Sequence, residues 1–452
     1  MFIKNKIFYM FVFILPILIL GEPTGTYKYT STKGITLNIK KDNKIPYMVT
    51  RLEINIPECK YNPYLPYLNL IFMFNEILNK KDNLILSNLK KIGKDYKLEL
   101  YPDKIIIKNI FLKRKLNNYI DFIHSIYSYN LFSITKLNKI KSNFNFYLKT
   151  TFDYDKVFIQ NQIFSIIFDN NSKFNNTISD FYNTPNINLV FLKSFYKKIF
   201  KLSNSTLYIS GHMNPHLFLG QIENRFKNFR NSMKPVLLTC ENRFKKNNKK
   251  NIHFIKRKEL ISPNIYMVLH LNSDDKFIKN SMKIINHIIF GTPSGRLFKD
   301  SAKLKVHNLQ ITTSYIERNN FLIITNKIKT NKRYINKLIK IINLEFKYIL
   351  INKITRKEYL ETLNFFYGDF LFKMNDPYSD IFFTTNYLKK FFSKLTANAQ
   401  KTDFTIKINN ISKKIFTSKL NLFSKILLIE SSSYFSLTSI NNNLKLINIY
   451  LP

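Results

Sequence analysis

The sequence predicts an α+β protein made of two tandem homologous domains, each a mainly antiparallel sheet covered by helices. Its 452 residues are enough for two domains with full hydrophobic cores. The same order of strand-like and helix-like segments occurs twice, and matching segments lie about 220 residues apart. A repeat of that length indicates one duplicated domain, because solenoid repeats have periods of roughly 20–50 residues.

Composition limits the kinds of partner that the chain can have. The formal net charge is +42, which by itself suggests nucleic acid or an anionic membrane. Lysine is nevertheless spread over the whole chain, and only ten of the basic residues are arginine. Such a composition is typical of A/T-rich coding sequences, so we expect no specific nucleic-acid partner. Cys59 and Cys240 could pair only if the fold brings them together, which the sequence does not decide.

Residues 1–21 are predicted to be a signal peptide or an N-terminal anchor. Lys4 and Lys6 precede an uncharged apolar run, 7–20, which matches a signal-peptide core and is shorter than the roughly 20 residues that span a bilayer. The cleavage pattern is poor because Ile19 is not small, so an uncleaved anchor is the alternative. Either way, we expect the rest of the chain to be exported across or anchored to a membrane, in a periplasmic-type compartment.

The first predicted domain covers residues 22–240. Its expected strands have alternating or β-branched patterns and lie at 34–41, 48–56, 96–100, 104–108 and 205–210. Its expected helices lie at 64–78, 116–127, 134–151 and around 222–226. The segment 64–78 is apolar almost all round, which is typical of a buried helix.

The second predicted domain covers residues 253–452 and repeats this order. Its expected strands lie at 264–271, 309–315, 320–325 and 426–429, and its expected helices at 276–290, from 296, at 332–349 and from 354. The opening Ile354-Thr355 of the last helix matches Ile134-Thr135 in the first domain. The lysine-rich segment 241–252 between the domains is expected to be a solvated linker, although it could also be a basic patch.

One turn in the second domain connects the sequence to a known family. In Gly291-Thr-Pro-Ser294-Gly-Arg296-Leu-Phe an apolar helix ends, a turn follows, and a new helix opens. With one strand before it and two after it, this turn resembles the C-terminal domain of the insulinase / mitochondrial-processing-peptidase (pitrilysin-type) family of zinc peptidases. The resemblance covers about residues 35–450. It implies two tandem domains with the metallohydrolase fold of the processing-peptidase type.

The resemblance also implies a zinc site, which this sequence lacks at the expected place. Active members of the family carry His-x-x-Glu-His on the first long helix, where the two histidines bind one zinc ion and the glutamate activates its water. In this sequence the motif falls near Leu70, Met73 and Phe74, and no histidine precedes His124. None of the three side chains can ligate zinc or move a proton, and the nearby Glu76 is interpreted as a residue of the helix surface or end.

The family's third ligand, a glutamate further along the same domain, is missing as well. No glutamate lies between Glu99 and Glu223, and the helix predicted for 134–151 has no carboxylate. An open catalytic zinc site needs three protein ligands. We therefore predict no catalytic residues, no metal ligands and no cofactor, with zinc lost from a fold that binds it elsewhere in the family. The substrate-binding residues are unknown from the sequence.

Some bacterial members of the family work as pairs of one chain with zinc and one without. The chain without zinc then contributes an arginine and a tyrosine that grip substrate, both placed after the Ser-x-Arg-Leu-Phe turn. Alignment on Arg296 puts these positions at Ala302 and about Leu309, where neither function is kept. Tyr315 and Arg318 lie further on and could compensate, although no pattern supports that role.

The histidines could suggest other sites. His212 and His216 have the i, i+4 spacing of a metal-binding pair, but Pro215 lies between them and two histidines without a carboxylate make an incomplete site. Ser294 lacks the neighbours of a nucleophile elbow or a phosphate loop. The other histidines of the second domain stand singly and are more typical of packed side chains: His253, His270, His287 and His307.

We interpret the sequence as a non-catalytic, peptidase-like protein that pairs with a zinc-bearing relative and helps to enclose unfolded peptides. One alternative is a zinc metallopeptidase with a relocated site, which metal content would reveal. Another is a basic protein that binds a membrane or nucleic acid, which a steep salt dependence of binding would reveal.

Overall fold

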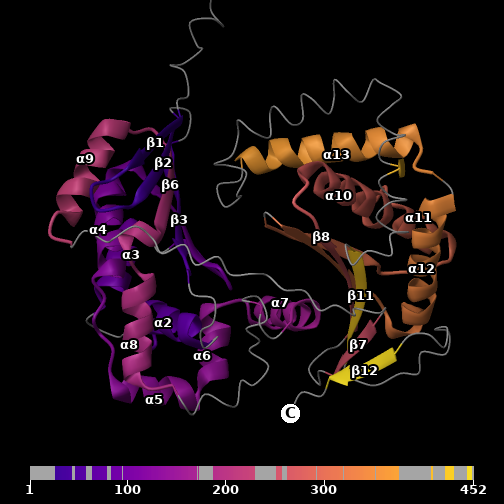
Figure 1. Ribbon diagram of the computed structural model, residues 1–452, viewed down its shortest axis with the longest axis horizontal. Coiled ribbons are helices and arrows are strands. Elements are labelled where there is room, and N and C mark those ends of the chain that lie inside the picture. Colours follow the sequence, from indigo (N-terminus) through magenta and orange to yellow (C-terminus); the bar gives the residue numbers. More distant parts are fainter. Residues whose placement is uncertain are drawn as a thin grey trace, which may run out of the picture. The chain divides into compact units, whose positions relative to one another are not determined.

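The computed structural model forms two compact units, each built from one β-sheet and its helices. The first unit contains the elements from β1 to α9, and the second contains those from β7 to β12 (Figure 1). The structure describes residues 26–42, 46–57, 64–78, 83–93, 95–169, 172, 187–229, 251–256, 262–291, 293–318, 320–351, 353–375, 409–410, 423–431 and 445–449. The predicted α+β class with two sheets is confirmed.

The first sheet has six strands in the order β1-β2-β6-β3-β5-β4. These strands are β1 (Thr26–Thr30), β2 (Thr36–Lys41), β3 (Tyr47–Asn55), β4 (Tyr96–Tyr101), β5 (Lys104–Leu112) and β6 (Ser205–Gly211). Neighbouring strands are antiparallel except β2 and β6, which run parallel. In β2 the alternate residues Leu37 and Ile39 are buried, because successive side chains of a strand point to opposite faces.

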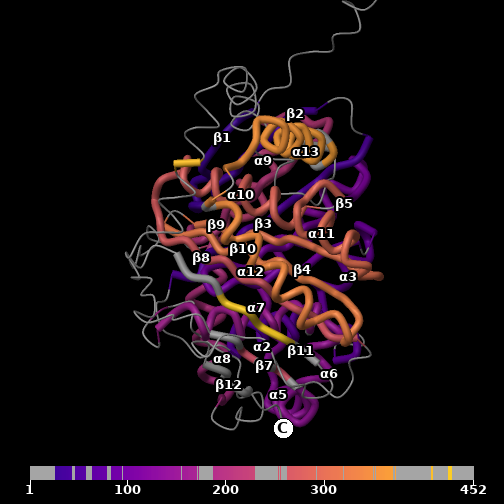
Figure 2. The backbone as a smooth tube through the Cα atoms, turned by 90° about the vertical axis from the view of Figure 1, so that its right-hand side faces the viewer, coloured from indigo at the N-terminus to yellow at the C-terminus, as the bar shows by residue number. Residues whose placement is uncertain are grey.

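Eight described helices belong to the first unit. They are α2 (Tyr64–Phe74), α3 (Leu84–Ile92), α4 (Leu116–Tyr127), α5 (Ile134–Ser142), α6 (Phe144–Thr151), α7 (Tyr154–Ile167), α8 (Leu189–Ile199) and α9 (Pro215–Phe226), with the short η1 (Lys113–Lys115) and η3 (Leu202–Asn204). Phe111 of β5 stacks on Tyr119 of α4 with ring centroids 4.6 Å apart, which joins the sheet to this helix. Figure 2 shows β1, β2 and α9 at one end of the unit and α5 and α6 at the other.

Two predicted helices of the first unit have other bounds in the structure, and the sequence analysis does not predict α3, α7 or α8. Helix α2 ends at Phe74, four residues before the predicted end. The predicted helix 134–151 is interrupted at Asn143, which separates α5 from α6. The side chain of Ser142 donates to the carbonyl of Lys139, and the amide of Asn143 donates to Ser142. Short polar side chains compete in this way with the helical hydrogen bonds, and apolar periodicity does not reveal that competition.

The second sheet also has six strands, in the order β12-β7-β11-β8-β10-β9. These strands are β7 (Asn251–Lys256), β8 (Asn264–Asn272), β9 (Gln310–Glu317), β10 (Phe321–Lys329), β11 (Phe423–Ser431) and β12 (Lys445–Ile449). β7 runs parallel to β11 and β12, and the other neighbouring pairs are antiparallel. The described helices of this unit are α10 (Lys276–Phe290), α11 (Arg296–Lys303), α12 (Ile335–Ile351) and α13 (Arg356–Asn375), with the short η4 (Lys332–Tyr334).

The two sheets share the topology of five strands. β7, β8, β9, β10 and β11 take the places that β2, β3, β4, β5 and β6 have in the first sheet. The register agrees too. Asn55 pairs with Lys104 in the first sheet and Asn272 pairs with Phe321 in the second, so both partners move on by 217 positions. Only the outermost strand differs, because β1 is antiparallel to its neighbour and β12 is parallel.

Several sequence predictions lie outside the described residues. They concern the segment 1–21, the two cysteines and most of the linker 241–252, whose last two residues belong to β7. Within the part of the chain that the structure describes, no helix is long and apolar enough to cross a membrane.

Candidate functional site

Helix α2 occupies the place where the family resemblance puts a zinc motif. All eleven of its residues are buried, and Leu70 and Met73 have no exposed surface. The helix carries no charged residue, so burial on all sides stabilises it. Glu76 lies exposed just beyond the end of the helix.

Aromatic rings fill the space around the C-terminal end of α2. The ring of Phe74 lies 5.6 Å from that of Tyr96 on β4 and 6.3 Å from that of Phe122 on α4. Phe72 packs on Phe132, with ring centroids 5.4 Å apart. Such pairs contribute roughly 0.5–1.5 kcal/mol each beyond the burial of their area. We call Phe72, Phe74, Tyr96, Phe122 and Phe132 the α2 aromatic cluster.

The structure brings the end of α2 to the segment that lacks a carboxylate. The side-chain amide of Asn75 donates to the hydroxyls of Thr150 and Thr151, at 3.0 and 3.3 Å. Both threonines lie at the end of α6, within the segment 134–151. Two segments that are distant in the sequence therefore meet here, and the groups in contact are an amide and two hydroxyls.

The residues at this place do not fit zinc. Zinc in proteins is bound by cysteine, histidine and carboxylate side chains. The groups here are leucine, methionine, phenylalanine, asparagine and threonine. Among the described residues as a whole, no group of three histidine, cysteine or acidic side chains could hold a metal ion. No catalytic step through a metal follows from this arrangement, and the absence of a cofactor stays a prediction.

The histidine pair of the first unit is divided between a turn and a helix. His212 is exposed after β6, and His216 is in the first turn of α9, where its ring packs edge-on against Tyr29 at 5.7 Å. Asn214 caps this helix by accepting hydrogen bonds from the backbone N–H groups of His216 and Leu217. The i, i+4 spacing therefore does not come from two turns of one helix face.

The histidines of the second unit lie in separate elements. His270 of β8 is buried, and its burial lowers its pKa to about 3. His287 of α10 stacks on Phe365 of α13 at 4.0 Å, and burial lowers its pKa to about 4 in spite of the charge of Asp369. His253 is buried in β7, whereas His307 is exposed before β9.

The Gly-x-x-Ser-x-Arg-Leu-Phe turn connects α10 to α11. The N–H of Gly295 donates to the carbonyl of Gly291 at 2.6 Å, and a Cβ atom at Gly295 would lie 2.3 Å from that oxygen. Arg296 donates through Nε and Nη2 to both carboxylate oxygens of Glu358, at 2.6 and 2.9 Å. This bidentate pair fixes the start of α11 to the first turn of α13.

Sequence reasoning missed Glu358, although a local signal marks it. Thr355 and Glu358 form a capping box, in which each backbone N–H is bound by the other side chain. Burial alone would raise the pKa of Glu358, but the hydrogen bonds from Arg296 and Thr355 lower it to about 2. The Thr-x-x-Glu pattern is visible in the sequence, but its partner Arg296, 62 positions away, is not.

The positions expected to grip substrate have separate surroundings. Ala302 is exposed on α11, and Leu309 lies just before β9. Tyr315 is on β9, with the Nζ of Lys283 5.9 Å from its ring centroid. Arg318 donates through Nη1 to the carbonyl of its neighbour Glu317. Nothing in these contacts pairs a guanidinium with the tyrosine.

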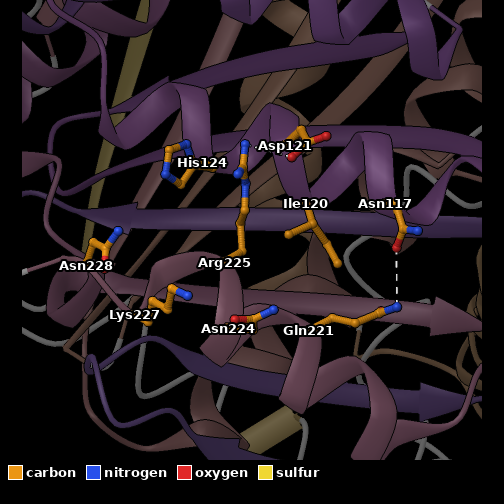
Figure 3. Close-up of a pocket in the computed structure, with 9 residues that line it drawn as sticks. All are labelled: Asn117, Ile120, Asp121, His124, Gln221, Asn224, Arg225, Lys227 and Asn228. Carbon is orange, nitrogen blue, oxygen red and sulfur yellow. Dashed lines mark hydrogen bonds and ion pairs between the residues drawn. The ribbon is translucent and has the colours of Figure 1, made fainter.

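A polar groove lies between α4 and α9 in the first unit (Figure 3). It has a volume of about 680 Å³ and is lined by Asn117, Ile120, Asp121, His124, Gln221, Asn224, Arg225, Lys227 and Asn228. Arg225 pairs with Asp121 at 2.9 Å, and Gln221 donates to Asn117 at 3.2 Å. Steps of four and seven residues put these polar side chains on one face of each helix. The sequence shows each stripe, but it does not show that the two helices meet.

A family model recognises part of this fold. The model for the peptidase M16 inactive domain matches residues 186–365, from just before α8 into α13. This part of the chain is similar to the inactive domain of peptidase M16. The predicted resemblance to the insulinase-type family is thus confirmed, and the matched part is peptidase-like and of the inactive-domain type.

Solved structures resemble nearly the whole chain. A peptidase M16 inactive domain from Pseudomonas fluorescens has a TM-score of 0.67 and 16% identity, covering 91% of this chain and 98% of its own. An M16-like peptidase from Alicyclobacillus acidocaldarius has a TM-score of 0.67 and 11% identity, covering 91% and 100%. At these identities the likeness shows the fold.

A larger structure is matched over about half of its length. The ferredoxin protease FusC, solved as a mutant in complex with Arabidopsis ferredoxin, has a TM-score of 0.60 and 11% identity. The match covers 92% of this chain and 49% of FusC. Among curated proteins, none is significantly similar to this chain in sequence.

Proposed function

We propose that this chain is the zinc-free partner of a zinc-bearing relative, with which it encloses unfolded peptides outside the cytoplasm. The observation that carries the proposal is the α2 aromatic cluster, which occupies the place where the family resemblance puts the zinc motif. The relative supplies the zinc and any peptide-bond chemistry. This chain supplies part of the wall that holds the peptide.

Two equivalent sheet edges support peptide binding. β4 ends the first sheet and β9 ends the second, and each pairs with one described strand only. The free side of an edge strand offers N–H and C=O groups to an extended peptide, which adds as a further strand. Binding of this kind uses the backbone, so it does not depend on the groups that are missing from α2.

The extent of the match to FusC supports a second chain. This chain corresponds to about half of FusC, so a second chain of similar size would complete an assembly of that length. A lasting complex needs an interface of roughly 1,200–2,000 Å² in total. The apolar run 7–20 supports a location across or at a membrane, where the partner would have to be present as well.

Coexpression with a zinc-bearing M16 relative from the same genome tests the proposal. We expect light scattering to give the mass of a complex, and cleavage of a labelled unstructured peptide to require the relative. Cleavage by this chain alone would instead favour an enzyme with a relocated site. A strict monomer that leaves the relative's cleavage rate unchanged would contradict the proposal.

Hydrogen exchange tests the sheet edges separately. Addition of an unstructured peptide should slow amide exchange in β4 or β9, because a new strand bonds the free N–H groups of that edge. The matched control is the same peptide with N-methylated backbone amides, which cannot donate those bonds and should leave exchange unchanged. Equal protection by both peptides would exclude strand addition.

A further inference from the structure

One end of the first unit exposes aromatic and apolar side chains. It consists of β1 and the start of α9, which lie together at the end of the unit opposite to α5 and α6 (Figure 1 and Figure 2). Tyr27 is 37% exposed and Leu217 is 67% exposed. We call Tyr27, Tyr29, His216 and Leu217 the β1–α9 strip.

Contacts within the strip hold it as one surface. The rings of Tyr27 and Tyr29 are stacked with centroids 6.4 Å apart, and Tyr29 packs on His216 at 5.7 Å. The N–H of Thr32 donates to a carboxylate oxygen of Glu223 at 3.3 Å, which ties the turn after β1 to α9. Tyrosine has an apolar ring and a polar hydroxyl, a combination that is enriched where a protein meets the headgroups of a bilayer.

The charge next to the strip suits an anionic surface. In the hairpin 26–42, Lys41 lies on the same face of the sheet as Tyr27, and Lys33 lies in the turn after β1. Lys28 and Lys40 lie on the opposite face. A basic residue close to an anionic bilayer strengthens binding to it. Glu223, the acidic residue of α9, is already bonded to the backbone of the same hairpin.

A short tether connects this end of the unit to the apolar N-terminal run. Five residues, 21–25, separate Leu20 from the first residue of β1. Even fully extended, they reach about 20 Å. We propose that the run 7–20 is retained in the membrane and that the β1–α9 strip lies against an anionic lipid surface. This inference does not depend on the proposed partner or on peptide binding.

The absence of tryptophan makes a direct test possible. The full chain contains no Trp, so Leu217→Trp introduces a single reporter into the strip. Phe146→Trp is the matched control, because Phe146 is 52% exposed on α6, at the opposite end of the unit. Each variant of the full chain is reconstituted into vesicles of phosphatidylcholine and phosphatidylglycerol with brominated acyl chains. Intact mass establishes whether residues 1–20 are retained.

We expect the tryptophan emission of Leu217→Trp to be blue-shifted, because interfacial side chains reach the acyl boundary. The brominated lipid should remove about half of the emission intensity of Leu217→Trp. It should remove about a tenth or less of the emission of the control Phe146→Trp. Vesicles of phosphatidylcholine alone should quench Leu217→Trp less. Equal quenching of the two variants, no quenching of Leu217→Trp, or removal of residues 1–20 in the mature protein would overturn the proposal.

Discussion

Leu70, Met73 and Phe74 are core residues of the first unit, and this packing makes a simple reversion to the zinc motif unfavourable. The variant Leu70→His, Met73→Glu, Phe74→His places polar groups among apolar neighbours, at a cost of roughly 1–3 kcal/mol for each unsatisfied group. We expect a clearly lower Tm, no stoichiometric zinc and no peptidase activity. The control Leu70→Met keeps volume and should cost less than about 1.5 kcal/mol. A triple variant that binds zinc and cleaves peptides would show that our assignment is wrong.

Arg296 has a structural role at the turn that carries the family resemblance. Arg296→Ala removes two charge-assisted hydrogen bonds and leaves Glu358 partly buried without its cation, so the free energy of unfolding should fall by roughly 1.5–3 kcal/mol. Because the folded pKa of Glu358 is about 2 and its ordinary value 4.5, this contribution is present above about pH 4.5 and is lost as the pH falls toward 2.

Urea unfolding at pH 7 and at pH 3 measures this effect. The control Lys303→Ala removes an ion pair whose lysine is largely exposed, and it should leave stability nearly unchanged. An Arg296→Ala variant as stable as the wild type at pH 7 would refute the structural role.

The raised pKa of Glu345 in α12 predicts a pH dependence of stability opposite in sign to that of Glu358. Burial, the hydrogen bond to Asp300 and the charge of Asp300 together raise the pKa of Glu345 to about 7 from its ordinary 4.5. A raised folded pKa means that stability is fully present below about pH 4.5 and is lost as the pH rises through 7. Glu345→Gln imitates the protonated acid, so its Tm should equal that of the wild type at pH 5 and exceed it at pH 8.

Melting curves across that range test the prediction, with Glu76→Gln, at an exposed position, as the control for the loss of one carboxylate. A Glu345→Gln variant whose Tm differs from that of the wild type by the same amount at pH 5 and pH 8 would contradict it.

At the scale of elements, apolar periodicity predicts those helices and strands whose formation depends on burial and strand pairing. Apolar spacing predicts the helix 276–290 and the strand beginning at 264. The observed bounds of α10 and β8 agree with these predictions within one residue. Apolar spacing does not predict the break at Asn143, because side-chain hydrogen bonds that compete with the helical backbone bonds cause it. The pairing of Arg296 with Glu358 was missed because it joins residues 62 positions apart.

The division into two units predicts where proteases cut first. The interval between α9 of the first unit and β7 of the second contains most of the predicted linker 241–252. Limited trypsin digestion should therefore cleave within that lysine-rich segment before it cleaves α2 or α10, since the helices are buried in their units. Mass spectrometry of the earliest fragments locates the cut. Early cleavage at 60–80 or 280–300 with the segment 241–252 intact would argue against the boundary.

At the scale of the whole molecule, the sequence indicated an M16-type fold whose zinc position is filled, and it did not indicate the surfaces that remain for binding. The loss of ligand types at Leu70, Met73 and Phe74 can be read from residue chemistry. The groove between α4 and α9 cannot, because its two polar stripes come from helices about a hundred positions apart. Partner surfaces depend in the same way on how distant segments meet.

Zinc content tests the central claim most directly. The purified chain, expressed in zinc-supplemented medium and dialysed without a chelator, should contain far less than one zinc ion per molecule by elemental analysis, because α2 and α6 offer no ligands. The zinc-bearing relative, purified in the same way, is the positive control and should hold about one. About one tightly held zinc ion per molecule of this chain would contradict the account.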